Sequence, residues 1–313
     1  MKLLVTGGAG FIGSNFINYW FERHPGDEIV NIDKLTYAAN KKNVEKRESK
    51  SYRFVEGDIA DTRAVDGLVK DVDAVVNFAA ESHVDNSIID SSPFIHSNIL
   101  GVQVLLEAAR KYEKRLHQVS TDEVYGSLAS ESKGRFTESS PYVPRNPYAA
   151  TKAAADHLVR AYCNTYNLKV SISNCSNNMG PYQHVEKLIP KCINNAMNNV
   201  SIPVYGDGLQ VRDWLYVEDH CSAIESILMH DTVGETYLVS ANQEKRNIEV
   251  VREILRRLGR PESLISYVKD RPGHDVRYAL DASKIRNELG WSPRYDFGKA
   301  LDKTMEWYGQ RPH

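Results

Sequence analysis

The stretch Thr6-Gly7-Gly8-Ala9-Gly10-Phe11-Ile12-Gly13 lies between an apolar run, Lys2–Thr6, and a helical pattern, Phe11–Arg23. Its glycines at positions 7, 10 and 13 give the spacing G-x-x-G-x-x-G. Glycine lets the backbone turn tightly and approach a pyrophosphate, which then meets the positive end of the helix. In this strand–turn–helix context, the stretch predicts a dinucleotide-binding loop rather than a loop built for turn geometry alone.

Strand-like runs and helical patterns alternate over the first 170 residues. The expected strands are Lys2–Thr6, Glu28–Ile32, Tyr52–Glu56, Ala74–Phe78, Leu116–Ser120 and Lys169–Ile172. The expected helices are Phe11–Arg23, Arg63–Val69, Pro93–Tyr112 and Tyr148–Tyr166. This alternation predicts an α/β fold with a doubly wound parallel sheet of the Rossmann type, and the continuous apolar runs suit strands that are buried on both faces.

After Asn174 the pattern weakens into short helices, turn-rich loops and scattered strands. The clearest elements there are helices at Asp219–Met229, Ile248–Arg257 and Ser283–Leu289 and a strand at Thr236–Val239, with no strong strand directly before the first of these helices. We therefore expect an NAD-binding domain at residues 1–174 and a smaller C-terminal α/β substrate-binding region at residues 175–313. Some elements of the second part should cross into the first.

A carboxylate follows the second expected strand. Asp33 stands twenty residues after Gly13, where it can accept hydrogen bonds from the hydroxyls of an adenosine ribose. The same carboxylate repels a 2′-phosphate, so the sequence favours NAD over NADP, although Lys34 beside it argues mildly the other way. We also expect Asp58-Ile59 to reach the adenine and Ala79-Ala80 to line the cofactor.

Two further motifs carry candidate catalytic groups. Tyr148 and Lys152 are four residues apart on one helical face, and a nearby ammonium favours the phenolate of a tyrosine whose ordinary pKa is about 10. Asp122 and Glu123 are adjacent carboxylates at the end of an apolar run. An acid and a base side by side need different environments, so the pKa of one carboxyl should be raised. Each motif alone could be a surface ion pair or a solvated loop.

The chain resembles the extended short-chain dehydrogenase/reductases and, within them, the dTDP-glucose 4,6-dehydratases. Thr121 stands where that family places the Ser or Thr that hydrogen-bonds the reacting oxygen. The resemblance runs nearly end to end and rests on these stretches: Ala79-Ala80-Glu81-Ser82-His83-Val84-Asp85, Ser120-Thr121-Asp122-Glu123-Val124-Tyr125-Gly126, Asn174-Cys175-Ser176-Asn177-Asn178, Glu186-Lys187-Leu188-Ile189-Pro190, Tyr205-Gly206-Asp207-Gly208-Leu209-Gln210-Val211-Arg212-Asp213-Trp214 and Asp270-Arg271-Pro272-Gly273-His274-Asp275.

The resemblance implies a reaction with no net redox change. Tyr148 would take the proton of the C4 hydroxyl of the sugar as a hydride passes to NAD⁺. The resulting ketone acidifies C5, where Glu123 would be the base, and Asp122 would be the acid at the departing C6 hydroxyl. The hydride would then return to C6, which gives a 4-keto-6-deoxy sugar.

These arguments together name the candidate site residues. The expected catalytic residues are Thr121, Asp122, Glu123, Tyr148 and Lys152. The expected cofactor-binding residues are Gly7, Gly10, Phe11, Ile12, Gly13, Asp33, Lys34, Leu35, Thr36, Asp58, Ile59, Phe78, Ala79, Ala80, Ser82, Ser97, Tyr148, Lys152 and Asn178. The expected substrate-binding residues are Ser82, His83, Thr121, Asn177, Lys187, Leu188, Pro203, Tyr205, Arg212, Asn247, Arg271 and His274.

Composition narrows the class of protein further. A net charge of −2 gives no field to recruit nucleic acid, and no apolar run is long enough for a membrane span. The four cysteines, at positions 163, 175, 192 and 221, are widely spaced and form no C-x-x-C pair, so we expect reduced thiols, no metal site and a cytoplasmic protein. By resemblance, we expect a homodimer through a four-helix interface. Ile99, Leu105 and Leu106 on one helix and Ala153, Leu158 and Val159 on another are the candidates, unless they only cover the sheet.

Three other functions remain open at this point. A nucleotide-sugar 4-epimerase would need Tyr148 and Lys152 but not Asp122 and Glu123. A non-catalytic NAD(H) sensor would not need the Tyr–Lys pair, and a structural protein would need none of these groups. The nucleobase is open too, since UDP-glucose or CDP-glucose would need only small changes in the pocket.

Overall fold

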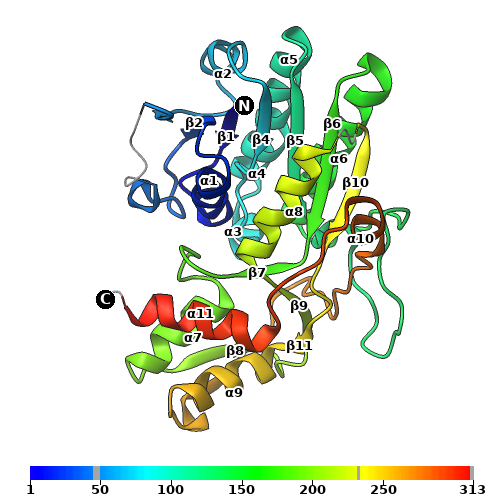
Figure 1. Ribbon diagram of the computed structural model, residues 1–313. Helices are drawn as coiled ribbons and strands as arrows, with labels where there is room; N and C mark the ends of the chain where they lie inside the picture. The colour runs from blue at the N-terminus through cyan, green and yellow to red at the C-terminus, as the bar shows by residue number, and fades with distance from the viewer. Residues whose placement is uncertain (45–49, 231–232, 311–313) are drawn as a thin grey trace.

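The computed structural model describes residues 1–44, 50–230 and 233–310, and its larger part is built on a parallel sheet (Figure 1). Seven strands of the described chain form this sheet, in the spatial order β3 (Tyr52–Glu56), β2 (Glu28–Asp33), β1 (Lys2–Thr6), β4 (Ala74–Asn77), β5 (Arg115–Thr121), β6 (Val170–Cys175) and β10 (Glu235–Val239). Every neighbouring pair is parallel. The doubly wound fold predicted from the alternation of strands and helices is therefore confirmed.

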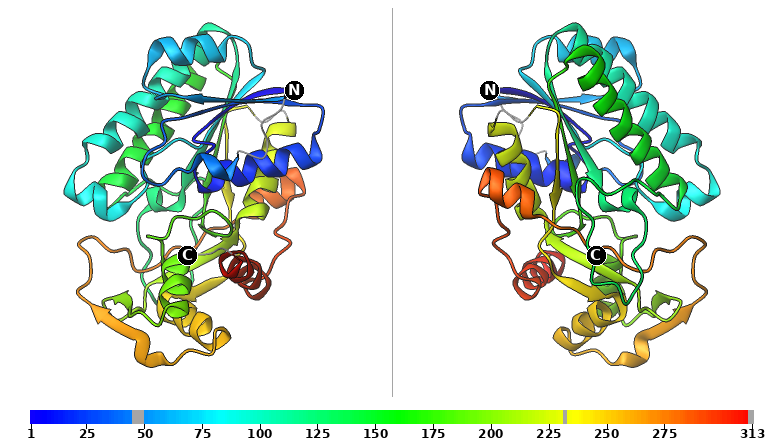
Figure 2. Two further views of the ribbon diagram at one scale, coloured as in Figure 1. Left: turned by 90° about the vertical axis from the view of Figure 1, so that its left-hand side faces the viewer. Right: turned by 90° about the vertical axis from the view of Figure 1, so that its right-hand side faces the viewer.

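Helices cover both faces of this sheet, as the two side views show (Figure 2). On one face, α2 (Thr62–Val69), α5 (Val102–Lys111) and α6 (Pro147–Tyr166) share a core with the strands. On the other face, α1 (Phe11–Arg23) and α8 (Val217–Met229) pack together. Strands buried on both sides explain why the apolar runs show no alternation.

The helix expected at Pro93–Tyr112 is not regular. It consists of α4 (Ser92–Phe94), a π-helical segment (Ile95–Gly101) and α5. Within the π-helical segment, the buried Asn98 side chain accepts a hydrogen bond from the Glu81 amide (2.9 Å) and donates to the Glu81 carbonyl (3.0 Å) and to Thr151 Oγ1 (3.0 Å). The wide turn therefore anchors the loop after β4, a use typical of π-bulges near functional sites.

The C-terminal part forms a smaller α/β layer below the sheet (Figure 1). It contains a three-stranded sheet of β7 (Asn177–Met179), β9 (Val211–Tyr216) and β11 (Glu244–Arg246) and a parallel pair of β8 (Ile202–Tyr205) and β12 (Ile265–Val268). Its helices α7 (Leu188–Met197), α9 (Asn247–Arg257) and α11 (Phe297–Gly309) enclose a separate apolar core with these strands. The strand β9 directly precedes α8, so the sequence-based expectation that no clear strand stands there was wrong.

Two segments of the second half return to the large sheet. β10 extends it beyond β6, and α8 covers its face, while α10 (Ser283–Leu289) packs against β10 and α8. The remaining helix, α3 (Val84–Ile89), lies in the loop after β4. We propose on this packing that the NAD-binding unit includes α8, β10 and α10 in addition to residues 1–174; the boundary at residue 174 stays a prediction.

Candidate active site

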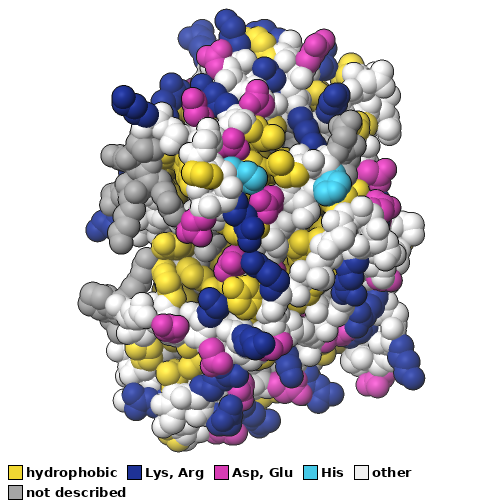
Figure 3. Space-filling model, viewed as in Figure 1, with side chains coloured by type: hydrophobic (Ala, Val, Ile, Leu, Met, Phe, Trp, Pro, Cys, Tyr) yellow, Lys and Arg dark blue, Asp and Glu magenta, His cyan; other side chains and the backbone are white. Residues whose placement is uncertain are grey.

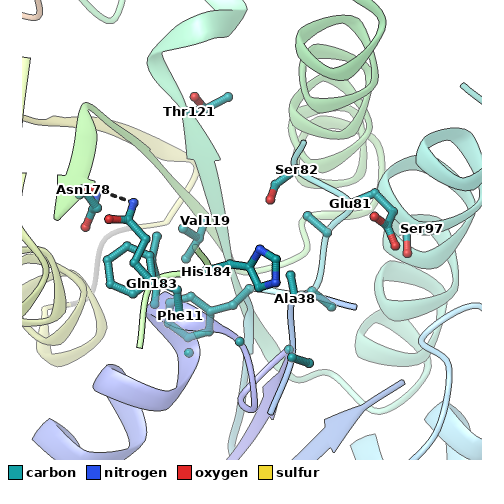
Figure 4. A pocket seen from close by; sticks show the side chains of 18 of the residues that line it. Phe11, Ala38, Glu81, Ser82, Ser97, Val119, Thr121, Asn178, Gln183 and His184 are labelled. Carbon is teal, nitrogen blue, oxygen red and sulfur yellow. Dashed lines mark hydrogen bonds between the residues drawn. The ribbon is translucent and has the colours of Figure 1, made fainter. Parts of the chain in front are cut away.

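A cleft of about 350 Å³ opens beyond the carboxyl ends of β1, β4, β5 and β6. The start of α7 closes its other side, so both parts of the chain contribute walls. Figure 4 shows Glu81, Ser82 and Ser97 on one side of this space and Asn178 and Gln183 on the other. In open α/β sheets this edge is where ligands bind.

The glycine loop fits tightly against its neighbours. Gly7 has a φ of +68°, and a Cβ there would lie 2.7 Å from the Ala79 backbone. A Cβ on Gly13 would lie 2.4 Å from the Gly7 carbonyl oxygen. Both contacts are shorter than any side chain tolerates, so these two positions require glycine. The loop thus brings bare backbone to the start of α1, as a pyrophosphate site needs.

Two carboxylates stand at the far end of the cleft, beyond the glycine loop. Asp33 accepts hydrogen bonds from the amides of Ala9 (2.9 Å) and Leu35 (2.8 Å), while burial raises its pKa. Burial also opposes ionisation of Asp58, but hydrogen bonds from Lys34, the Ala60 amide and His96 outweigh it and lower the pKa of Asp58 to about 2.

The ammonium of Lys34 lies 2.7 Å from Asp58 Oδ2, so a carboxylate already compensates this cation. Lys34 is therefore less suited to bind the 2′-phosphate of NADP, and the preference for NAD that Asp33 indicates is strengthened.

The tyrosine and lysine of α6 point toward the end of β5. Tyr148 is 8% exposed and lines the cleft together with Thr121. Lys152 Nζ donates to the Val119 carbonyl at 2.8 Å. Burial, with added repulsion from Glu123, raises the pKa of Tyr148 well above its usual value, and burial lowers the pKa of Lys152. The lower pKa that we expected for Tyr148 from the nearby lysine is therefore not found, because burial raises it.

The paired carboxyls differ strongly in environment. Asp122 is 2% exposed; its Oδ1 accepts a hydrogen bond from Thr121 Oγ1 (3.3 Å), and its buried Oδ2 has no hydrogen-bond partner among the described residues. Burial, and then the charge of Glu123, raise the pKa of Asp122 well above its usual value. Glu123 is only half-buried and accepts a hydrogen bond from Asn146 Nδ2 at 3.3 Å. The pair therefore places a buried carboxyl with a raised pKa beside a more exposed one.

Asn146 also fixes the helix that carries the tyrosine. Its side-chain oxygen caps α6 by accepting the amide of Ala149 at 2.8 Å, and Pro147 occupies the first turn. The Ser-Thr-Asp-Glu end of β5 and the start of α6 are thus joined by one side chain.

The expected cofactor-binding residues line the cleft together, with one exception. Leu35 is not part of the wall and contributes its amide to Asp33 instead. Of the expected substrate-binding residues, Ser82, Thr121, Asn177, Lys187 and Leu188 also line it. Lys187 Nζ donates to the Ser82 carbonyl at 3.0 Å, which links α7 to the loop after β4.

The other expected substrate-binding residues are not part of the cleft wall. Tyr205 donates to Asp85 Oδ2 at 3.0 Å, and Arg271 lies 3.6 Å from Asp85 Oδ1. Arg212 turns inward to the carbonyls of Val211 (2.8 Å) and Asp275 (2.9 Å). His274 is bound to Asp270 at 2.6 Å. His83, Pro203 and Asn247 are half-buried and likewise do not line the cleft.

Sequence reasoning missed a number of residues of the wall, among them Cys175, Gln183, His184 and Glu186. Gln183 donates to the Asn178 carbonyl at 3.0 Å, the bond drawn in Figure 4. Glu186 stands beside Lys187 and could have been found from that proximity. Burial raises the pKa of Cys175 to about 12, so its thiol stays protonated and is a poor nucleophile.

A glycine loop under a parallel sheet, a Tyr–Lys pair on a helix and a cleft between two α/β parts define the extended short-chain dehydrogenase/reductase class. Comparison with known proteins narrows this further. Residues 4–304 match the family described as GDP-mannose 4,6 dehydratase, and the chain belongs to this family of nucleotide-sugar dehydratases.

Individual relatives agree with the family. The dTDP-glucose 4,6-dehydratase of Mycobacterium tuberculosis (strain ATCC 25618 / H37Rv) is 49% identical over 309 residues, which cover 98% of this chain and 93% of the relative. The crystal structure of DesIV, a dTDP-glucose 4,6-dehydratase from Streptomyces venezuelae with NAD and TYD bound, has a TM-score of 0.96 at 45% identity, with 99% of this chain and 98% of that chain covered. The dTDP-glucose 4,6-dehydratase of Bacillus anthracis str. Ames in complex with NAD has a TM-score of 0.93 at 47% identity, with 99% and 97% covered.

Two further properties concern metals and membranes. Over residues 1–44, 50–230 and 233–310, no group of three or more His, Cys, Asp and Glu side chains is arranged to hold a metal ion. Within the same described ranges, no helix is both long and apolar enough to cross a membrane. The face seen in Figure 3 mixes basic and acidic side chains.

Proposed function

We propose that this protein is a dTDP-glucose 4,6-dehydratase that uses bound NAD and releases dTDP-4-keto-6-deoxy-glucose and water. The single observation that carries the proposal is the carboxyl pair beside Tyr148: buried Asp122 with its raised pKa next to the half-buried Glu123. Simple hydride transfer needs no such pair. The close relatives named dTDP-glucose 4,6-dehydratase support the choice of substrate.

The cleft residues fit NAD. Gly7 and Gly13 leave room for a pyrophosphate where a Cβ would collide, and Asp33 is fixed at the end of β2 with its oxygens toward the cleft. Ser176 Oγ and Asn177 Oδ1 are buried cleft atoms without a hydrogen-bond partner among the described residues, so they suit polar groups of a ligand. When bound, NAD supplies the hydride acceptor and donor of the reaction.

The side chains divide the proton transfers among them. Tyr148, which lines the cleft together with Thr121, is placed to take the proton of the C4 hydroxyl, with Lys152 one turn away on α6 to favour the phenolate. The half-buried Glu123 removes the proton from C5, which the C4 ketone has acidified. Asp122 is neutral because of its burial and can give its proton to the C6 hydroxyl as water leaves.

A 4-epimerase is the competing activity on this scaffold. Such an enzyme needs only the oxidation at C4, which Tyr148 and Lys152 provide. The separate environments of Asp122 and Glu123 would then have no use, and a buried carboxyl without a hydrogen-bond partner on one oxygen is costly. The dehydratase is therefore the better proposal.

Residues near the mouth of the cleft are proposed to grip the nucleoside diphosphate. Arg271 and Tyr205 both contact Asp85, and Lys187 lines the cleft, so these two cations are our candidates for the groups that bind the diphosphate. Arg212, Asn247, His274 and Pro203 stay predictions for this role. The preference for thymidine over uridine as the nucleoside rests on the names of the relatives, so UDP-glucose remains the alternative substrate.

The test is turnover of a panel of dTDP-, UDP-, CDP- and GDP-hexoses, followed by alkali, in which a 4-keto-6-deoxy product absorbs near-ultraviolet light. We expect the strongest signal from dTDP-glucose. Recovery of the galactose epimer without that absorbance would refute the dehydratase and support the epimerase.

We also propose a homodimer. Leu105, Leu106, Ala153 and Val159, which we expected at the interface, are buried in the core of the single chain and cover the sheet. Support for an interface comes instead from the outer side of the same helical region, where Ile89 (84% exposed), Ile95 (51%) and Leu100 (45%) face outward. A cytoplasmic location is proposed because all four cysteines are free thiols.

A further inference from the structure

A carboxyl group with no part in the chemistry above lies behind the catalytic pair. Asp156 is 0% exposed and follows Lys152 by one helical turn on α6. An ionised carboxylate is rarely left in a protein interior unless a cation and hydrogen bonds compensate it. The hydrogen-bond donors and cations around Asp156 therefore indicate its role.

One oxygen of Asp156 joins three segments of the chain. Oδ2 accepts hydrogen bonds from Ser120 Oγ (2.8 Å), Tyr142 OH (2.9 Å) and Asn174 Nδ2 (3.1 Å). Three donors on one oxygen favour the ionised form. Ser120 and Asn174 lie near the ends of β5 and β6, so the carboxylate is held in register with the strand that carries Thr121.

The second oxygen of Asp156 has different surroundings. Oδ1 of Asp156 is buried and has no hydrogen-bond partner among the described residues. Residues four apart share a helical face, so Lys152 precedes Asp156 by one turn on the same face of α6. In the described part of the chain the two side chains form no direct ion pair, and their charges act on each other over a longer distance. Burial lowers the pKa of Lys152 and raises the pKa of Asp156, and the charge of each residue opposes the shift of the other. Each ion therefore stabilises the charged form of the other.

Other titratable groups around the pair do not replace this anion. Cys175 faces Lys152 from β6, but burial keeps its thiol neutral. Tyr125 and Tyr142 face Asp156, and burial raises the pKa of both phenols. Arg160, one turn beyond Asp156, donates to Tyr142 OH at 2.7 Å and competes with Lys152 for the same negative charge.

We propose that Asp156 is a positioning residue for the reaction: its buried carboxylate is the counter-ion that keeps the Lys152 ammonium charged and directed at the end of β5. The lysine can then favour the phenolate of Tyr148 when the sugar hydroxyl is deprotonated. This inference rests on the proposed function. Asp156 acts through Lys152 and touches none of the reacting atoms.

The test compares Asp156→Asn with Tyr142→Phe. Asparagine keeps the size of the side chain and loses the charge, whereas Y142F removes one hydrogen bond to the same oxygen and leaves the charge. In each variant the rate of NADH formation in a single turnover with dTDP-glucose is measured against pH. A Lys152 without its anion loses its proton at lower pH, so the alkaline limb for D156N should move down by about one pH unit or more. Y142F should leave that limb in place.

A second readout does not depend on turnover. Only a neutral amine reacts with acetic anhydride, so peptide mass spectrometry should find Lys152 acetylated faster at pH 8 in D156N than in the unmodified protein. Lys299, whose side chain is 72% exposed, serves as the internal reference. An unmoved limb with unchanged labelling in D156N overturns the proposal, and so does an equal shift in Y142F.

Arg160→Met keeps the idea testable if D156N does not fold. Removing the competing cation leaves more of the Asp156 charge to Lys152, so the alkaline limb should move upward, and an unmoved limb would overturn the proposal. If the unmodified protein makes no 4-keto product, the proposed function fails, while the labelling of Lys152 still tests its pairing with Asp156.

Discussion

Replacing Glu123 by glutamine separates the two halves of the proposed reaction. The side chain keeps its size and loses the ability to take a proton, while Tyr148, Thr121 and Lys152 are untouched. We expect oxidation at C4 to continue and elimination to stop. Enzyme-bound NADH should then accumulate, because the step that consumes it follows the removal of the C5 proton.

The structure allows the loss of activity to be distinguished from a loss of folding. Glu123 is half-buried, and its hydrogen bond from Asn146 is long at 3.3 Å, so the bond contributes about 0.5 kcal/mol to stability. A general base contributes about 10²–10⁴-fold in rate, which is roughly 3–5 kcal/mol of transition-state stabilisation. The melting temperature should therefore fall by about 2 °C or less while kcat falls at least about 100-fold.

Two assays decide the outcome. Stopped-flow absorbance follows NADH in a single turnover with dTDP-glucose, and mass spectrometry follows deuterium uptake at C5 from heavy water. E123Q should show an NADH rise that does not decay and no deuterium at C5. Asn146→Ser, which keeps a capping oxygen for α6 but removes the amide donor to Glu123, is the matched control and should keep most of the exchange. Normal turnover of E123Q would refute the assignment of the base.

Three more outcomes follow from the geometry. The pKa of Asp122 is raised in the folded state, so the stability that comes from its protonated form is fully present below the ordinary pKa of 3.8 and is lost as the pH rises through the raised pKa. Asp122→Asn should therefore have a higher melting temperature than the unmodified protein at pH 8, and the difference should vanish toward pH 4. A difference in melting temperature that does not depend on pH would contradict this. Gly13→Ala should lose the rise in melting temperature on adding NAD, since its Cβ would lie 2.4 Å from the Gly7 oxygen, whereas Gly67→Ala, with open space around it, should keep that rise. Ile95→Glu should sediment as a monomer. Val200→Glu is the control, because Val200 is also 51% exposed but lies outside the proposed interface, and this variant should stay dimeric. A dimer in both variants would place the interface elsewhere.

The sequence predicted the large sheet well because its signals are local. The bounds expected for the helix Phe11–Arg23 agree with α1, since a glycine loop begins it and an apolar face continues through it. The helices α7 and α11 were not predicted as individual elements. α7 contains Pro190 and two asparagines, which are more typical of a loop, and its apolar face is defined only by the separate core that it enters.

The candidate site was predictable where chemistry follows a strand or a helix turn, and less so elsewhere. Thr121, Asp122 and Tyr148 come together in one cleft because the end of β5 and the start of α6 are adjacent. The direction of the pKa of Tyr148 was not predictable, since it depends on burial by distant segments. Asp156 gave no signal, because a charged residue in a helix ordinarily reads as solvent-exposed, and its partners Ser120 and Asn174 are 36 and 18 residues away.

The seventh strand of the sheet has a consequence for synthesis of the chain on the ribosome. β6 ends at Cys175, but its outer partner β10 ends only at Val239. Until about sixty more residues have emerged, the strand next to the catalytic one is an open edge with unpaired amides and carbonyls, and such edges invite pairing with other chains. During this interval the nascent chain can therefore pair with other chains through the edge of β6. A fragment that stops at residue 174 would keep that edge open permanently and should aggregate.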